Sequence, residues 1–423
     1  MISLDISALE RVSSDSPSWL AAARSAAFEL FESLDLPSPK EEIWRYVDLD
    51  FALSDFSLPL EPGPALPPGS ASGGGRQFVV VDGLTAGPAP SAPEGASLVS
   101  LAQALKEDPS LEGRYDGLGV VEHDKFSAAS RAFGLDGAHL RIAKGSVVSE
   151  PVFLDVQAVT PQSVSFPRAF VEVEEGAEAS VVVGFRSDDS LNALVVPEID
   201  VSVGDNANLR LTIVQDWGNS TTAIARVRIV AARDAQVTLA EAGLGGSLAR
   251  LHLSVDLEGQ GSSARVVGTY FGDADQVLDY RYFMRHIGEN TNSDMFLKGG
   301  VEDEALSIFT GMIRIEETAQ KTNAFQTNRN LLLSEDASAQ SVPNLEILAN
   351  DVKCGHGSTV GPLDEDQRYY LMSRGLDQKR SDRLQVRGFF EEALARFPER
   401  SVTGPVRERI NAKYIEAQRE GRV

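Results

Sequence analysis

Residues 169–185 read AFVEVEEGAEASVVVGF, and this stretch decides the fold. Apolar residues alternate with polar or small ones on both sides of Gly176, which predicts two short strands joined by a turn. The turn-then-strand unit recurs as GAEASVV at Gly176, NANLRLT at Asn206, DAQVTLA at Asp234, GSSARVV at Gly261, DEALSIF at Asp303 and DASAQSV at Asp336. The intervals are 30, 28, 27, 42 and 33 residues. A quasi-period of this length, built from short strands and small-residue turns, is typical of a solenoid.

The segments between these units contain no helical pattern of ten or more residues, which argues against a doubly wound α/β sheet. We therefore predict a mainly β core over residues 139–361, coiled as a right-handed parallel β-helix. A sandwich of two antiparallel sheets is the rival architecture, because the pattern alone does not give the direction of the strands.

Bulk composition excludes several classes of protein. The 423 residues exceed the usual size of one domain, and 42% of them are hydrophobic, which is enough for a sizeable core. No apolar run approaches the roughly 18 residues of a membrane span. A formal net charge of −23 argues against binding to nucleic acid, which needs a basic surface. A single cysteine rules out an internal disulfide framework and fits a reducing cytoplasm.

Residues 1–138 are predicted to form a helical region with a linker. Apolar side chains recur at three- and four-residue spacing over residues 18–34, which predicts an amphipathic helix. Proline, glycine, alanine and serine dominate residues 58–93, a composition typical of a linker. One short strand is expected within this linker, at residues 77–81. Two short helices are expected after it, at residues 100–107 and 125–133.

Residues 362–423 are predicted to form a helical domain. They carry 13 Lys or Arg against 11 Asp or Glu, so their charge differs from that of the acidic body. Helices are expected from Asp364, over residues 378–396 and over residues 406–418. The second helix carries an apolar stripe that we interpret as exposed: Leu384, Phe389, Phe390, Leu394 and Phe397. Such a stripe can cap the open end of a solenoid or occupy a groove of a partner, and the pattern leaves both open.

The only cysteine, Cys354, stands two residues before His356 in the motif KCGHGSTVG. In an extended strand residues i and i+2 face the same side, so the thiol and the imidazole are expected side by side. A thiolate with an imidazole suits zinc or iron–sulfur species, but two ligands cannot close a tetrahedral site. If this pair binds metal, the other ligands must come from another chain, because the remaining histidines are scattered: His123, His139, His252 and His286.

Two alternatives remain for this pair. Cys354 can be a small buried hydrophobe beside a histidine with a structural hydrogen bond. A Cys–His nucleophile dyad is also conceivable, although no orienting residue is evident.

Other motifs are interpreted as structural. GLGG at Gly243 lacks the G-x-G-x-x-G spacing, and no G-x-x-x-x-G-K-[ST] occurs, so the chain itself is not expected to bind ATP in that way. His286, in RHIGENTNSD, is taken as a polar turn residue. A polar series could form a sugar-binding face, but stacked amides are common inside solenoids, and we favour that structural interpretation for Asn323, Gln326, Asn328, Asn330 and Gln340.

The chain resembles the SufB/SufD proteins of the SUF iron–sulfur assembly system, most strongly over about residues 279–397. The likeness is carried by HIGENTNSD and by FTGMIRIEETAQKTNAFQTNRNLLLSEDASAQSVPNLEILANDVKCGHGSTVGPLDEDQRYYLMSRGL, with EEIWRYVDL near the N-terminus. Within the family, KCGHGSTVG with Cys354 and His356, together with the short chain, is closer to the SufD branch than to the SufB branch.

The resemblance implies a non-catalytic scaffold subunit and not an enzyme. Such a subunit would pair with SufB through the β-helix, with a homodimer as the option when isolated. It would hold the SufC ATPase with its C-terminal helices, through Leu384, Phe389, Phe390, Leu394 and Phe397. A transient iron–sulfur cluster would form at the SufB–SufD interface, with Cys354 and His356 as candidate ligands. The sequence does not decide whether a flavin is carried.

Two readings from other classes compete with the scaffold. A β-helix carbohydrate-active enzyme would require paired carboxylates on one face of the solenoid. A purely structural β-helix adaptor would leave Cys354 inert.

Overall fold

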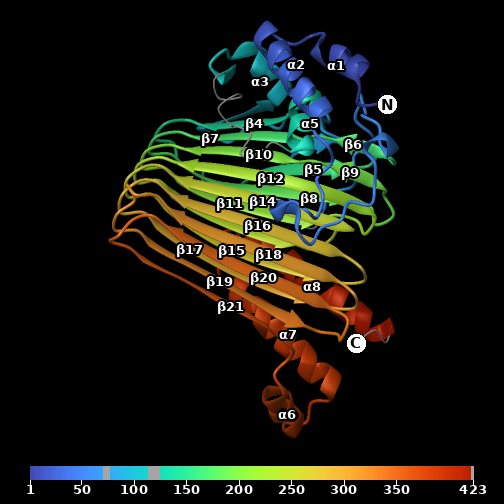
Figure 1. The fold of residues 1–423 in the computed structure, drawn as a ribbon, viewed down its shortest axis with the longest axis vertical. Coiled ribbons are helices and arrows are strands. Elements are labelled where there is room, and N and C mark those ends of the chain that lie inside the picture. The colour runs from blue at the N-terminus through green and yellow to red at the C-terminus, as the bar shows by residue number, and fades with distance from the viewer. Residues whose placement is uncertain (70–76, 113–123, 421–423) are drawn as a thin grey trace.

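Two parallel sheets wind around a shared core in a computed structural model, which describes residues 1–69, 77–112 and 124–420 (Figure 1). One sheet has ten strands in the order β2 (Leu84–Thr85), β1 (Gln77–Val81), β5 (Val152–Ala158), β8 (Glu178–Ser187), β11 (Asn208–Asp216), β13 (Gln236–Gly243), β15 (Ser263–Gly272), β17 (Asn292–Val301), β19 (Asn323–Leu332) and β21 (Lys353–Gly361). Its strands alternate along the chain with those of the second sheet, so the chain climbs one coil at a time.

The second sheet has eleven strands. Its main order is β20 (Ser338–Ile347), β18 (Leu306–Ile315), β16 (Val277–His286), β14 (Leu248–Leu257), β12 (Thr221–Ala231), β10 (Glu198–Val203), β7 (Arg168–Val173), β4 (Gly137–Ile142) and β3 (Ala96–Ser100), with β6 (Ser163–Ser165) and β9 (Ala193–Val195) beside it. Among the described strands, antiparallel pairing is confined to β1 with β2 and β3 with β4. The predicted parallel solenoid is therefore confirmed, and the antiparallel sandwich is excluded.

Equivalent residues of successive coils stack in register inside the solenoid. One inward-facing column on the ten-stranded sheet runs through Leu209, Val237, Ala264, Ser293, Ala324 and Cys354. The steps of this column are 28, 27, 29, 31 and 30 residues, which accounts for the period seen in the sequence. Alternation within each strand buries this face, because successive side chains point to opposite sides.

A residue in the left-handed region marks the same corner of successive coils. Each one donates its backbone N–H to the next coil, as Gly176 does to the Asp205 carbonyl at 2.8 Å. Asn290 (φ 58°) belongs to this corner but is absent from the turn-then-strand units identified in the sequence. Asp303 (φ 56°), which is among those units, turns at the opposite corner. The anomalous interval of 42 residues therefore mixed the two corners. Gly, Asn and Asp recur here because they tolerate this conformation, at Gly176, Asn206, Asp234, Gly261 and Asn290.

The N-terminal helices cover the outer face of the eleven-stranded sheet. Trp44, Phe126 and Phe133 pack with outward-facing side chains of that sheet in one apolar cluster. The predicted strand at residues 77–81 is β1, and β1 and β3 extend the two sheets. The helical elements are α1 (Ile6–Ser13), α2 (Ser18–Ser33), η1 (Glu42–Trp44), η2 (Leu53–Asp55), α3 (Leu101–Glu107) and α5 (Lys125–Phe133).

The C-terminal helices cover the outer face of the ten-stranded sheet. They are α6 (Glu365–Ser373), α7 (Gln378–Leu394) and α8 (Arg400–Glu420), and α7 packs against β15 and β17. Phe390, Leu394 and Phe397 are buried there against side chains such as Phe271 and Phe296. The expectation that these three residues are exposed was wrong. The helices also do not cap the end of the solenoid, because their apolar stripe packs against the outer face of the ten-stranded sheet.

None of the helices in the described ranges is long and apolar enough to cross a lipid bilayer.

Candidate functional site

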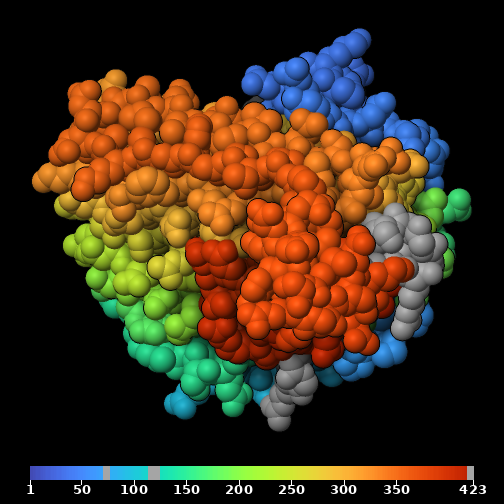
Figure 2. All heavy atoms as spheres, turned by 90° about the horizontal axis from the view of Figure 1, so that it is seen from below, coloured from blue at the N-terminus to red at the C-terminus, as the bar shows by residue number. Residues whose placement is uncertain are grey.

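The C-terminal end of the solenoid is open. β20 and β21 are the last strands of their sheets, and within the described residues nothing pairs with their outer edges. β20 contains Pro343, a residue that sheets tolerate at an edge because it lacks an N–H to donate. Seen from this end, the final strands form an exposed orange strip, and the C-terminal helices lie beside it (Figure 2). Unpaired edges of this length are templates for another strand.

Cys354 and His356 both occupy inward-facing positions of β21. In register they follow Ala324 and Gln326 of β19, which are completely buried. Because no coil follows β21 among the residues that the structure describes, the same column becomes accessible: Cys354 is half-buried and His356 is exposed. The predicted placement of Cys354 and His356 on one face of the strand is thus confirmed.

The pair offers a thiol and an imidazole, which are two of the four ligands of a tetrahedral metal site. Burial raises the pKa of the Cys354 thiol, so at neutral pH it is protonated until a metal or a cationic group displaces the proton. A thiol in that state is a weak nucleophile, which disfavours the dyad. Among residues 1–69, 77–112 and 124–420, no group of three His, Cys, Asp or Glu side chains is placed to hold a metal ion. His123 lies outside these ranges.

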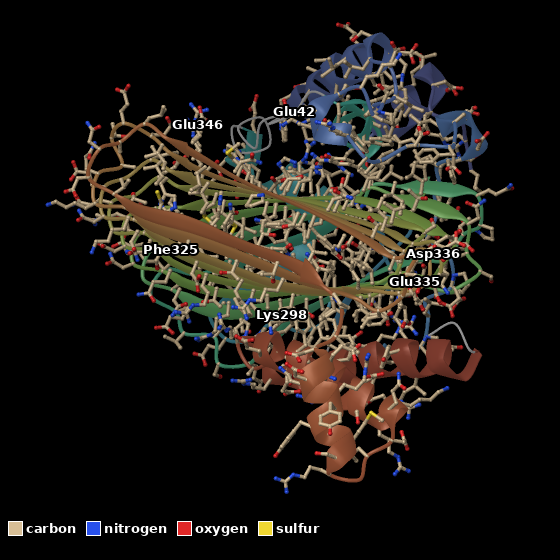
Figure 3. The ribbon with its side chains drawn as sticks, turned by 60° about the horizontal axis from the view of Figure 1, so that its bottom comes forward. Glu42, Lys298, Phe325, Glu335, Asp336 and Glu346 are labelled. Carbon is tan, nitrogen blue, oxygen red and sulfur yellow. The ribbon has the colours of Figure 1, made fainter. Side chains whose placement is uncertain are left out.

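On the opposite, outward face of β21, two successive positions are glycines and carry no side chain. Gly355 and Gly357 alternate with Cys354 and His356, so they point outward. A Cβ added at Gly357 would meet no atom within 4 Å. Beside them on β19, the Phe325 side chain is 45% exposed (Figure 3). Sequence reasoning missed this feature, although the alternation of glycine with Cys and His was its signal.

Three members of the amide series lie inside the solenoid, whereas Asn323 is exposed and Gln340 is half-buried. Tyr270 donates its hydroxyl to Asn330 Oδ1 at 2.6 Å and accepts from Asn328 Nδ2 at 3.1 Å, and Asn330 Nδ2 donates to Asn328 Oδ1 at 2.7 Å. Gln326, Asn328 and Asn330 are buried, so they present no sugar-binding face. The favoured structural interpretation is confirmed for these three.

His286 is a structural residue, but it is the last residue of β16 and not the turn residue that was predicted. It is fully buried, and its two ring nitrogens hydrogen-bond Thr291 Oγ1 and Ser293 Oγ, both at 2.8 Å. Burial lowers its pKa to about 4, so the ring is neutral at physiological pH. These two hydrogen bonds connect the end of β16 to the start of β17 across the corner.

A second buried titratable group, Glu241 on β13, was not singled out from the sequence. Its Oε1 accepts from Gln215 Nε2 at 3.1 Å and its Oε2 accepts from the Tyr282 hydroxyl at 3.4 Å. Burial raises the pKa of this carboxyl to about 8. The carboxyl is therefore protonated at neutral pH, inside the core of the solenoid.

A groove of about 470 Å³ lies between α6, α7 and the end of β19. Of the five predicted docking residues, only Leu384, which is 48% exposed, and the half-buried Phe389 line it. Lys298 supports its floor: Nζ lies 4.2 Å from the Phe389 ring centroid and 2.5 Å from Glu392 Oε2 (Figure 3). Around the groove α6 exposes side chains that the apolar-stripe argument overlooked: Tyr369, Tyr370 and Met372.

Comparison with known proteins places these features in one region. The model of a family described as SUF system FeS cluster assembly, SufBD core domain, matches residues 156–389. An iron–sulfur cluster assembly SufBD family protein of Mycobacterium tuberculosis is 29% identical over 397 residues, 91% of each chain. Proteins named SufD are 27% identical in Escherichia coli, over 89% of each chain, and 28% identical in Bacillus subtilis, over 72% of this chain and 71% of the relative. The matched range contains the open end and most of the groove.

Proposed function

The chain belongs to the SufBD family of the SUF iron–sulfur cluster assembly system, and from this premise we propose that it is a non-catalytic scaffold subunit. It pairs with a SufB-like partner through the open end of the solenoid and binds a SufC-like ATPase through its C-terminal helices, in the cytoplasm. The nascent cluster is cargo, formed where the two scaffold chains meet. The names of the SufD relatives support this assignment.

The proposal rests on the open end of the solenoid, where a candidate metal site lacks ligands and two strands lack partners. Cys354 and His356 lie on the inward column of a coil that nothing covers, and the edges of β20 and β21 are unpaired within the described chain. A second solenoid that continues both sheets would satisfy the backbone edges and would also supply the missing ligands. One docking event then completes the fold and the site together.

Val360→Lys tests the pairing surface. Val360 occupies an inward position of β21 and is 42% exposed, so the free chain accommodates the charge. Buried at the interface, an unpaired ammonium should weaken binding by about 2 kcal/mol or more, at least ten-fold. The measurement is the amount of SufB-like partner that co-purifies with the tagged chain after co-expression.

The matched control is Val147→Lys, an exposed valine (67%) at the opposite end of the solenoid, which should leave partner recovery unchanged. Equal recovery with both variants would place the interface elsewhere. Size-exclusion chromatography of the isolated variants checks whether the same edge also forms the homodimer.

We assign ATPase docking to the groove between α6 and α7. Leu384, Phe389 and Tyr370 give it an apolar wall, and apolar and aromatic anchors in a pocket dominate most interfaces. The buried Phe390 and Phe397 hold α7 in place and do not contact the partner. Deleting the helices would uncover Phe271 and Phe296, so surface substitutions are the cleaner test.

Leu384→Asp should reduce recovery of the ATPase about ten-fold or more, because a carboxylate in the groove must be desolvated on docking. Recovery of the SufB-like partner should be unchanged, since Leu384 belongs to α7 and not to the unpaired strand edges of β20 and β21. Ile6→Asp, at a comparably exposed position on α1, is the control. ATPase recovery equal to that of the control would show that α6 and α7 only support the sheet.

A further inference from the structure

A cavity of about 380 Å³ lies far from the C-terminal helices, on the outer face of the eleven-stranded sheet. One wall is a strap, residues 42–46, which crosses the strands near the open end. Figure 3 shows Glu42 of the strap on the side of the molecule opposite Lys298 and the C-terminal helices. The floor combines Phe283, Met312 and Val342, from neighbouring strands of the sheet. Its volume falls in the range of small-molecule sites.

The strap is held in place by two arginines of the sheet. Arg250 Nη2 donates to the Ile43 carbonyl at 2.7 Å, and its guanidinium lies 3.9 Å from the ring centroid of the buried Trp44. Arg281 Nη2 donates to the Arg45 carbonyl at 3.0 Å. The cavity is therefore pre-formed, because its wall is fixed by contacts more than 200 residues away in sequence.

Tyr46 carries backbone strain at the edge of this cavity. Its φ is 77°, in the left-handed region, where a bulky residue is about 1–3 kcal/mol less stable than in an ordinary conformation. The side chain is 42% exposed and lines the cavity. The Arg45 guanidinium lies 5.3 Å from the centroid of the Tyr46 ring, and a glycine would adopt this backbone without strain. Strain of this kind is typical of positions kept for binding.

The charges around the cavity favour an anion. Asp279 pairs with both Arg250 and Arg281, so this buried trio keeps one positive charge. Arg45 and Glu42 add one charge of each sign, and His252 lines the same wall. A site of net positive charge is notable in a chain with a formal charge of −23. Arginine also suits the paired oxygens of carboxylates, sulfonates and phosphates, because its planar guanidinium presents its donors as a fork.

We propose that this cavity binds an aromatic anion. The ring contacts Phe283, Met312 and the Tyr46 side chain, and the anionic group faces Arg45 and Arg281. This binding activity goes beyond the scaffold role. It needs neither Cys354 nor His356, and the isolated chain is sufficient for it.

The test is titration of the isolated full-length chain with 8-anilinonaphthalene-1-sulfonate, followed by probe fluorescence. Wild type should bind one probe saturably, with an affinity that falls as salt rises. Thr310→Trp should weaken binding at least ten-fold, because Thr310 lies in the row between Arg281 and Val342 and a large ring there fills the cavity. Thr327→Trp is the matched control, at a half-buried outward position on the opposite sheet, and should bind like wild type.

A second variant keeps the test independent of how Thr310→Trp folds. Tyr46→Gly removes the ring and relieves the strain, so it should fold normally and bind several-fold more weakly. Probe affinity unchanged in both Thr310→Trp and Tyr46→Gly would place the dye elsewhere and overturn the proposal, as would the absence of saturable binding to wild type. Because no partner chain enters the assay, failure here is distinguishable from failure of the scaffold role.

Discussion

Replacing His356 by alanine is expected to abolish most cluster formation by the assembled complex while leaving the complex itself intact. The side chain is exposed at the open end, so its loss creates no core cavity. In the proposed function, it does remove one of the two donor groups that this chain would contribute to the shared site. We expect the yield of assembled cluster to fall about ten-fold or more, since even the loss of an outer-shell partner of a metal ligand costs about 10- to 100-fold in metal affinity.

The measurement is reconstitution of the complex of the chain with its SufB-like and SufC-like partners, followed by the visible absorbance of the cluster and activation of a client apoenzyme. Cys354→Ala should give a smaller loss, because its thiol must first lose a proton that burial holds in place. Ser358→Ala, at the next inward position of β21, is the matched control. An unchanged yield with His356→Ala in a normally assembled complex would support the adaptor reading, in which the pair is inert.

Glu241→Gln is expected to remove a large pH dependence of stability that arises in the core. The carboxyl of Glu241 has a pKa of about 8 when folded, against an ordinary value of 4.5. A raised folded pKa gives stability that is fully present below pH 4.5 and is lost as pH rises through 8. Between these values the unfolded chain loses its proton while the folded chain keeps it. From pH 5 to pH 9 this loss is about 4 kcal/mol in the free energy of unfolding.

Denaturant titrations at pH 5 and pH 9 measure this effect. Wild type should be less stable at pH 9 relative to Glu241→Gln, and the difference between the two proteins should largely close at pH 5. A glutamine keeps the shape and the hydrogen-bonding capacity of the protonated acid, so the variant should fold. Glu258→Gln, at an exposed position, controls for the loss of one carboxyl. Parallel pH profiles for wild type and Glu241→Gln would refute the buried neutral carboxyl.

The sequence determined the features of this protein that depend on local order. The coil length follows from turns at Gly176, Asn206, Asp234 and Gly261, because the left-handed corner restricts residue type at one position. The sequence also predicts the strand β1 and the starts of α6 and α7. The two helix starts are predictable because Asp364 and Asp377 accept hydrogen bonds from the first turn of each helix. Cys354 and His356 share a face because every strand alternates, whatever it packs against.

Only the tertiary structure determined which segments pack against those faces. The stripe of α7 reads as exposed from the sequence, but Phe390, Leu394 and Phe397 are buried because an apolar sheet face lies beside them. Glu241 looks like any polar residue in a strand until the opposite sheet encloses it. The cavity under the strap joins Tyr46 to strands more than 200 residues later through Arg250 and Arg281. Periodicity fixes where a side chain points, whereas burial, pKa and access depend on which distant segment occupies that direction.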